Sequence, residues 1–114
     1  MAALTAITPT VTGVTSTGTA VSASDTIDQG TLGSQGCYIE VINAGGSSDT
    51  VTISDFGTTA AGNSLTSNQY TVAVANGSSK IIWLQQSQVN PATGLITIAH
   101  SFTTSVTCKV YKNN

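Results

Sequence analysis

Apolar and polar residues alternate with a period of two along several short segments of this chain. In residues 37–43, Cys37, Ile39 and Val41 share one face, and residues 50–54 place Val51 and Ile53 on one face in the same way. This period is typical of half-buried β-strands, and the Gly-, Ser- and Asn-rich pieces between the segments are typical of turns. No helical period of useful length is present. The segments with strand character are 37–43 (CYIEVIN), 50–54 (TVTIS), 69–74 (QYTVAV), 80–84 (KIIWL), 95–100 (LITIAH) and 105–111 (SVTCKVY).

Short strands at this spacing predict an all-β fold, a single-domain antiparallel β-sandwich or a jelly-roll-like barrel. The pattern is weaker at the start of the chain, where Thr, Ser, Ala and Gly dominate. Residues 1–35 are therefore predicted to form an extended arm with one or two weak strands, and residues 36–114 to form the sandwich core. The predicted core residues are Val41, Val51, Ile53, Val72, Val74, Ile82, Ile98, Val106 and Val110.

Residues 69–86 read as strand, turn and strand. Asn76-Gly77 predicts a type I′ hairpin turn, because both residues tolerate a positive φ. The returning strand is apolar on both faces, which admits two interpretations. Either the strand is central and is covered by the arm or the second sheet, or Ile81 and Trp83 pack against another protein subunit. Ile81 and Trp83 are thus the candidate interface residues.

Charged residues make up only 7% of the chain, which carries three lysines, no arginine and a formal net charge of −2. Nucleic acids and anionic membranes are bound through clustered basic residues, so this composition argues against both partners. Neither a signal peptide nor a segment of transmembrane length is expected. Use in a reducing cytosol then favours Cys37 and Cys108 as buried free thiols, with a disulfide as the minor alternative.

The residues that could carry chemistry are few. The single histidine, His100, ends a strand beside Ser101, and no local motif makes it part of a catalytic trio. It is expected to be a surface or strand-end histidine. Asp25 and Asp28 could help to hold calcium, but a solvated turn explains them better. We therefore expect no enzymatic activity, no metal and no cofactor. Ice binding through Thr-x-Thr pairs is disfavoured, because the chain has no fixed repeat.

From Ala20 onward, the order of the segments resembles small all-β virion proteins of tailed phages that infect actinobacteria. The resemblance rests on an "AVSASDTID" segment, a "CYIEVIN" strand, a Gly/Ser turn, "VTI" and "TVAV" strands, a "KIIWL" strand, and the closing "LITIAH" and "TSVTCKV" strands. The chain departs from the family in its second long loop, in Trp83 and in its long Thr/Ser arm, so the family does not indicate the docking site.

The resemblance implies a structural virion protein, most often a capsid decoration or minor capsid protein on the head exterior, assembled in the host cytoplasm. Its partners would be the major capsid protein or other virion subunits, and we expect a homo-oligomer. The family contributes no catalytic or metal-binding residues. The alternative is a tail or neck component, including a host-glycan-binding module. A small secreted hydrolase or binding domain has the least support.

Overall fold

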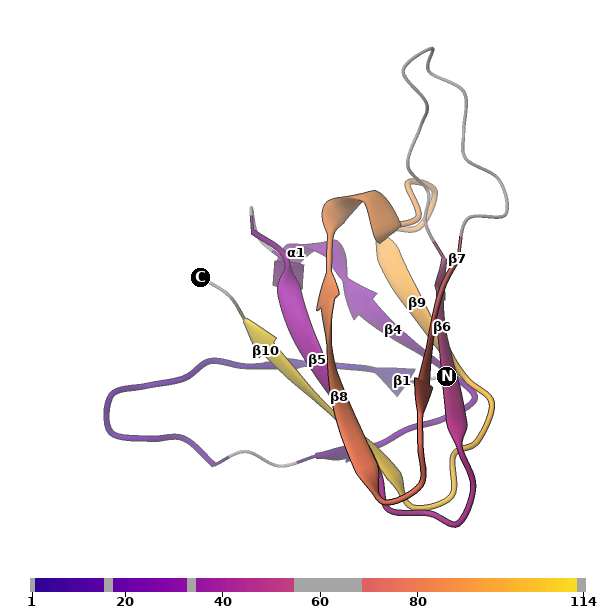
Figure 1. Cartoon of the computed structure of the whole chain (residues 1–114). Coiled ribbons are helices and arrows are strands. Elements are labelled where there is room, and N and C mark those ends of the chain that lie inside the picture. Colours follow the sequence, from indigo (N-terminus) through magenta and orange to yellow (C-terminus); the bar gives the residue numbers. More distant parts are fainter. Residues whose placement is uncertain (1, 16–17, 33–34, 55–68, 113–114) are drawn as a thin grey trace.

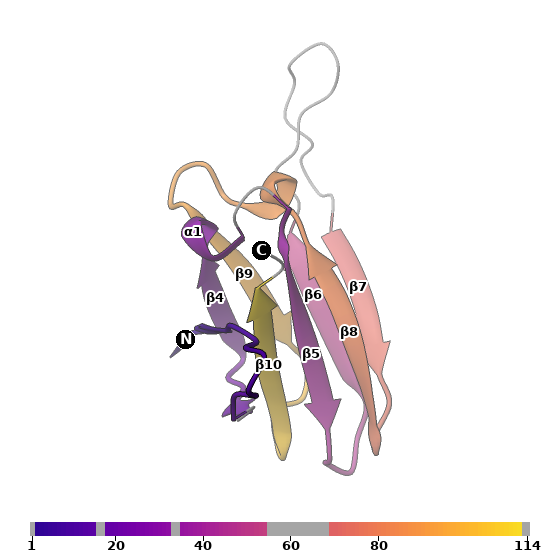
Figure 2. The same cartoon turned by 90° about the vertical axis from the view of Figure 1, so that its left-hand side faces the viewer.

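Two β-sheets pack face to face in the computed structural model of the chain, which describes residues 2–15, 18–32, 35–54 and 69–112 (Figures 1 and 2). The first sheet has the strand order β1 (Ala2–Ala3), β4 (Ser24–Asp28), β9 (Leu95–His100), β6 (Asp49–Ser54) and β7 (Gln69–Val74). The second sheet has the order β2 (Ala6–Ile7), β10 (Val106–Lys112), β5 (Cys37–Asn43) and β8 (Ser78–Leu84), with β3 (Thr19–Ala20) also paired to β10. Two single helical turns, α1 (Gln29–Leu32) and η1 (Gln86–Gln88), complete the described elements.

The predicted all-β sandwich is confirmed. Most neighbouring strands are antiparallel; β1 with β4 and β2 with β10 are parallel. The strands predicted at residues 37–43, 69–74 and 95–100 have the bounds of β5, β7 and β9, and the others differ by a residue or two at their ends. Residues 55–68, between the strands predicted at 50–54 and 69–74, lie outside the described residues.

The predicted core is also confirmed. Seven of the nine predicted side chains are almost completely buried, and Val72 and Ile82 are partly buried against the same cluster. Alternation is responsible: β5 and β9 turn every second residue toward the opposite sheet, and their burial alternates accordingly. Burying such side chains provides most of the free energy that stabilises the sandwich.

The predicted hairpin at Asn76-Gly77 is wrong in two respects. β7 pairs with β6 in the first sheet, whereas β8 pairs with β5 in the second, so the turn connects the two layers. Of the two turn residues only Gly77 has a positive φ, of 77°. With the hydrogen bond from the Ser78 N–H to the Ala75 carbonyl, this is the pattern of a type II turn, since type I′ needs two positive φ values. A period of two identifies strands and faces but not pairing partners.

The predicted division into an arm and a core is not where the fold divides. β4 pairs along its whole length with β9, so residues before 36 form an internal strand of the first sheet. Ile27 and Leu32 are fully buried, and Leu4 is nearly so. Only residues 8–15 match the expectation of an arm: they leave the edge of β10 as an extended loop (Figure 1), in which Val11 is fully exposed.

Cys37 and Cys108 are free and buried, as predicted, on the inner faces of β5 and β10. Burial raises the pKa of the Cys37 thiol from 9.0 to about 11. Burial, followed by the nearby charges of Asp25 and Cys37, raises the pKa of the Cys108 thiol to about 12. Both thiols therefore stay protonated in the folded protein at pH values where the unfolded chain has lost these protons.

This difference predicts that stability falls as pH rises above 9. From about pH 9 the unfolded thiols bind fewer protons than the folded ones, and the loss continues until the folded pKa values, about 11 and about 12, are passed. Urea unfolding below pH 9 and between pH 9 and 11 measures the effect. The double variant Cys37→Ala with Cys108→Ala is expected to lose less stability over this interval than the wild type, and an equal loss would contradict the prediction.

Candidate functional site

The outer face of the second sheet carries a row of large side chains that crosses all four of its main strands. The register pairs Ile7 with Tyr111, Tyr111 with Tyr38, and Tyr38 with Trp83. Side chains at paired positions point to the same side of a sheet, and the neighbours of these residues along β5 and β10 point inward. We call Tyr111, Tyr38 and Trp83 the aromatic row. Strands lie about 4.8 Å apart, so three rings on adjacent strands span about 10 Å.

The aromatic row is open to solvent at its β8 end. Trp83 is 51% exposed and Ile81, two residues before it on the same face, is 66% exposed. Beside the aromatic row lies a second row formed by Lys109, Glu40 and Ile81. The face therefore combines apolar contact area with one cationic and one anionic side chain.

Hydrogen bonds position two of the three rings. The Trp83 Nε1–H donates to the Gln35 carbonyl at 3.1 Å, and the Tyr111 hydroxyl donates to Glu40 Oε1 at 3.1 Å. Gly36, with φ of 80°, lies under the indole: a Cβ at this position would lie 2.7 Å from Trp83 Nε1 and would collide with the Leu84 carbonyl. The absence of a side chain at Gly36 thus lets the indole lie close to the backbone.

The structure decides between the two interpretations of the 80–84 strand only in part. The strand is not central: β8 is the last strand of the second sheet, and Ile81 and Trp83 are exposed. The N-terminal segment does not cover them, because β1, β2 and β3 pair with β4 and β10 at the other side of the sandwich. The interpretation of Ile81 and Trp83 as residues that contact another molecule stays a prediction.

Tyr38 and Tyr111 are not among the interface residues predicted from the sequence. A signal for both was present. Cys37 and Ile39 face inward, so Tyr38 between them has to face outward, and the same holds for Tyr111 after Val110. The sequence does not give the register of β10, β5 and β8, and only this register shows that the three rings lie side by side.

A second group of residues lies buried in the first sheet, at the end where β9 finishes and β6 begins. His100 Nδ1 is 2.7 Å from Asp49 Oδ2, and His100 Nε2 is 3.9 Å from Asp25 Oδ2. All three side chains are fully buried. We call these residues the buried Asp-His-Asp cluster; it connects β4, β9 and β6.

Backbone and hydroxyl donors complete the hydrogen bonds of both carboxylates. Asp49 Oδ1 accepts the N–H groups of Ser101 and Phe102 at 3.0 and 3.2 Å. Asp25 accepts the Ser22 hydroxyl at 2.5 Å and the Ser22 N–H at 3.2 Å. Among the described residues, His100 Nε2 has no hydrogen-bond partner.

This cluster corrects two expectations. His100 ends its strand as expected but is buried, not at the surface, and Asp25 is a buried strand residue rather than part of a solvated turn. The reason is that both fall on the inward face of their strands, where each carboxylate finds donors. The Ser22 hydroxyl donates to Asp25 and not to His100, so the imidazole does not activate this hydroxyl as a nucleophile.

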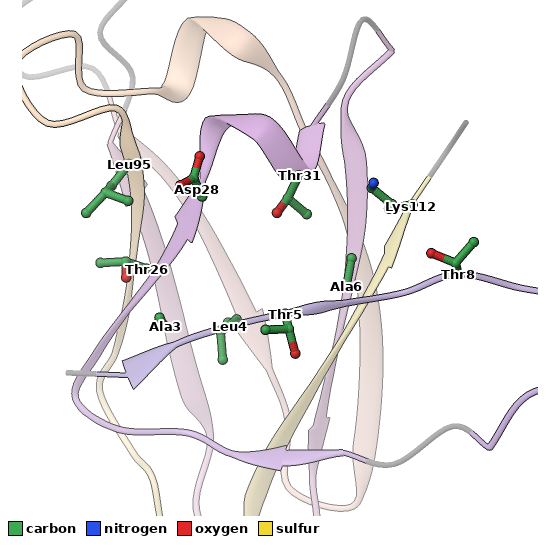
Figure 3. A pocket seen from close by; sticks show the side chains of 10 residues that line it. All are labelled: Ala3, Leu4, Thr5, Ala6, Thr8, Thr26, Asp28, Thr31, Leu95 and Lys112. Atoms are coloured by element: carbon green, nitrogen blue, oxygen red, sulfur yellow. The ribbon is translucent and has the colours of Figure 1, made fainter.

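A pocket of about 380 Å³ opens where the N-terminal segment passes from the first sheet to the second (Figure 3). Figure 3 shows Asp28 and Lys112 at opposite sides of it, with Thr5 and Thr31 between them. Asp28 lies at the exposed end of β4, and its Oδ1 accepts the Gly30 N–H at 2.8 Å. That bond closes a local turn between Asp28 and Gly30.

Comparison with known proteins adds no relative. No protein-family model, curated protein or solved structure matches this chain. The aromatic row, with its exposed end at Ile81 and Trp83, is therefore the feature from which a function has to be argued.

Two further findings concern the part of the chain that the structure describes. Its His, Cys, Asp and Glu side chains form no group of three or more that could hold a metal ion. None of its helices has the length and apolar character needed to cross a membrane.

Proposed function

We propose that this protein is a structural component of a tailed-phage virion that attaches to the outside of the head through the outer face of its second sheet. The observation that carries the proposal is the aromatic row, which ends in the exposed side chain of Trp83, together with the exposed Ile81 in the row beside it. The partner would be the major capsid protein or another subunit of the shell. The resemblance in segment order supports the phage origin.

The composition of this face is that of a contact surface. Contiguous exposed apolar side chains on a small protein mark interaction sites, and Trp and Tyr are enriched at the centres of protein interfaces. The chain has few charges, so little charge has to be desolvated when it docks. Many copies on one repeating shell would also allow neighbouring copies to reinforce weak individual contacts.

We expect Trp83→Ala to weaken attachment to phage heads by tenfold or more while the melting temperature stays within a few degrees of the wild-type value. Truncating a Trp anchor costs about 2 kcal/mol or more of binding free energy, and about 1.4 kcal/mol is tenfold. Trp83 is half exposed, so its removal leaves the core intact. Co-sedimentation of the purified protein with heads that lack it measures the attachment.

Tyr70→Ala is the matched control. Tyr70 is an aromatic residue of the same exposed fraction, 51%, but it lies on β7 at the edge of the first sheet. It is expected to bind heads as the wild type does. Undiminished binding by Trp83→Ala, or equal losses in the two variants, would contradict the proposed docking face.

A tail or neck component that binds a host glycan is the second candidate, and one observation favours it. Three rings in one row on a sheet face form the kind of platform on which sugar rings stack, and Glu40 and Lys109 lie beside it to bond hydroxyl groups. The same two variants decide between the candidates. Binding of the wild type and Tyr70→Ala, but not Trp83→Ala, to host cell-wall polysaccharide without binding to heads would favour the glycan.

A further inference from the structure

The β8 strand presents an open edge. One side of it is paired to β5 from Ser78 to Leu84. On its other side no strand of the described chain is paired to it, so alternate N–H and C=O groups point away from the sheet. The opposite edge of the sheet differs, because β2 and β3 both pair with β10 there.

The β8 edge has only one of the features that usually prevent edge strands from pairing, a single lysine. Proteins protect such edges with proline, bulges, charged side chains (lysine above all) or very short strands. β8 is seven residues long, has the sequence SSKIIWL and carries one charge, on Lys80. It pairs with β5 without interruption of the register, and Ile81 and Trp83 are exposed.

We propose that two copies of this chain pair antiparallel through their β8 strands, about a two-fold axis at Ile82. In a two-fold interface, residue i of one copy meets residue j of the other and j meets i. With the axis at Ile82, Ile81 lies opposite Trp83 of the second copy, and Trp83 lies opposite Ile81. The two exposed apolar residues of each copy then form two aromatic to β-branched cross-strand pairs, which are among the favourable ones.

Charge disfavours the registers whose axis lies closer to Lys80. With the axis at Ile82, each Lys80 lies opposite Leu84 of the second copy, and the two lysines are about 13 Å apart along the strands. This separation exceeds the screening length of about 8 Å at physiological ionic strength. With the axis at Ile81 the lysines would be about 7 Å apart along the strands, and Trp83 would lie opposite Ser79. With the axis at Lys80 the two lysines would lie directly opposite each other.

The pairing goes beyond the proposed function and does not depend on a phage particle. Side chains of a sheet face stay accessible when strands join at their edges, so the paired second sheets would present one continuous outer face carrying two aromatic rows. Backbone pairing along seven residues makes a small interface, so the dimer is expected to be weak and dependent on concentration.

Sedimentation velocity of the purified full chain, from micromolar to millimolar concentration, tests the pairing. We expect a monomer–dimer equilibrium in the wild type. In Ile81→Lys, which adds a charge at the edge, the dissociation constant of the dimer should be at least tenfold higher. Thr71→Lys is the matched control, because Thr71 is exposed on β7, the edge strand of the first sheet. It is expected to dimerise as the wild type does. A wild type that stays monomeric at every concentration, or a dimer unaffected by Ile81→Lys, would overturn the proposal.

Disulfide crosslinking tests the register. Ile81→Cys and Trp83→Cys proteins of different tag length are oxidised separately and as a mixture. The axis at Ile82 predicts that the mixed dimer crosslinks much faster than either protein alone. Cys37 and Cys108 do not compete, because both are buried. Faster crosslinking of Ile81→Cys with itself, or of Trp83→Cys with itself, would overturn the proposed axis.

Discussion

Asp49→Ala is expected to lower the free energy of unfolding by about 3 to 5 kcal/mol at neutral pH, because it removes one partner from a buried polar network and leaves the others without it. Small domains are stable by only about 5 to 15 kcal/mol, so this variant should be largely unfolded at moderate urea concentrations. Asp49 is fully buried at the start of β6. Its carboxylate is the one group of the buried Asp-His-Asp cluster that bonds both the imidazole and the backbone.

The size of the effect follows from the groups that the variant leaves without a partner. His100 Nδ1 loses its contact at 2.7 Å, and the N–H groups of Ser101 and Phe102 lose their acceptor. Asp25 then remains as a buried carboxylate beside a histidine that no longer bonds Asp49. A buried group left without its partner costs about 1 to 3 kcal/mol, and the N–H groups of Ser101, an exposed residue, and Phe102, a half-buried one, add less because water can reach them.

Asp28→Ala is the control for this variant. Asp28 is exposed and accepts one backbone N–H, from Gly30, so its loss is expected to cost less than about 1 kcal/mol. Urea unfolding monitored by Trp83 fluorescence gives both values. If Asp49→Ala were no less stable than Asp28→Ala, the cluster would not be a structural network, and its role would have to be sought elsewhere.

Local alternation explains why so much of the sandwich could be predicted from the sequence. A strand that buries one face must place apolar residues at every second position, so β5 and β9 are visible in the sequence at residues 37–43 and 95–100. The inward residues follow directly, and this is why the predicted core is confirmed.

Pairing partners are not encoded in the same local way. The type II turn at Gly77 and the inter-layer connection that it makes depend on β5 lying beside β8. The burial of His100 could not be predicted either, because it depends on Asp49 and Asp25, which lie 51 and 75 residues away along the chain. A histidine at an inward strand position is compatible with a surface site until its partners are known.

Only half of the candidate site could be predicted from the sequence. Ile81 and Trp83 stood out because the strand is apolar on both faces, whereas Tyr38 and Tyr111 lie in strands that alternate normally. Alternation places these tyrosines on the outer face, but only the register across three strands makes them neighbours of Trp83. A binding face made of several strands is therefore a property of the sheet and not of any one segment.

The N-terminal segment shows the same limit and leads to the second large prediction. Its apolar residues are sparse among Thr, Ser and Gly, so the local pattern indicates an arm. The contacts show otherwise. β4 pairs with β9 as its neighbour in the first sheet, and Ile27, which lies opposite Ile96, is fully buried. Three or four well-placed apolar side chains are enough to make such a segment part of the core.

Ile27→Ala is therefore expected to lower the free energy of unfolding by about 2 to 5 kcal/mol, the range observed when a buried isoleucine is replaced by alanine. The loss combines the transfer free energy of the missing methyl and methylene groups with the cavity left between β4 and the second sheet. Val11→Ala is the control within the same segment, since Val11 is fully exposed, and it should change stability by less than about 0.5 kcal/mol. Removing residues 1–35 should abolish cooperative unfolding, because β9 would lose its β4 neighbour and His100 would lose Asp25. A truncated chain that unfolds cooperatively at the wild-type urea concentration would show that residues 36–114 fold alone and that β4 only rests against them.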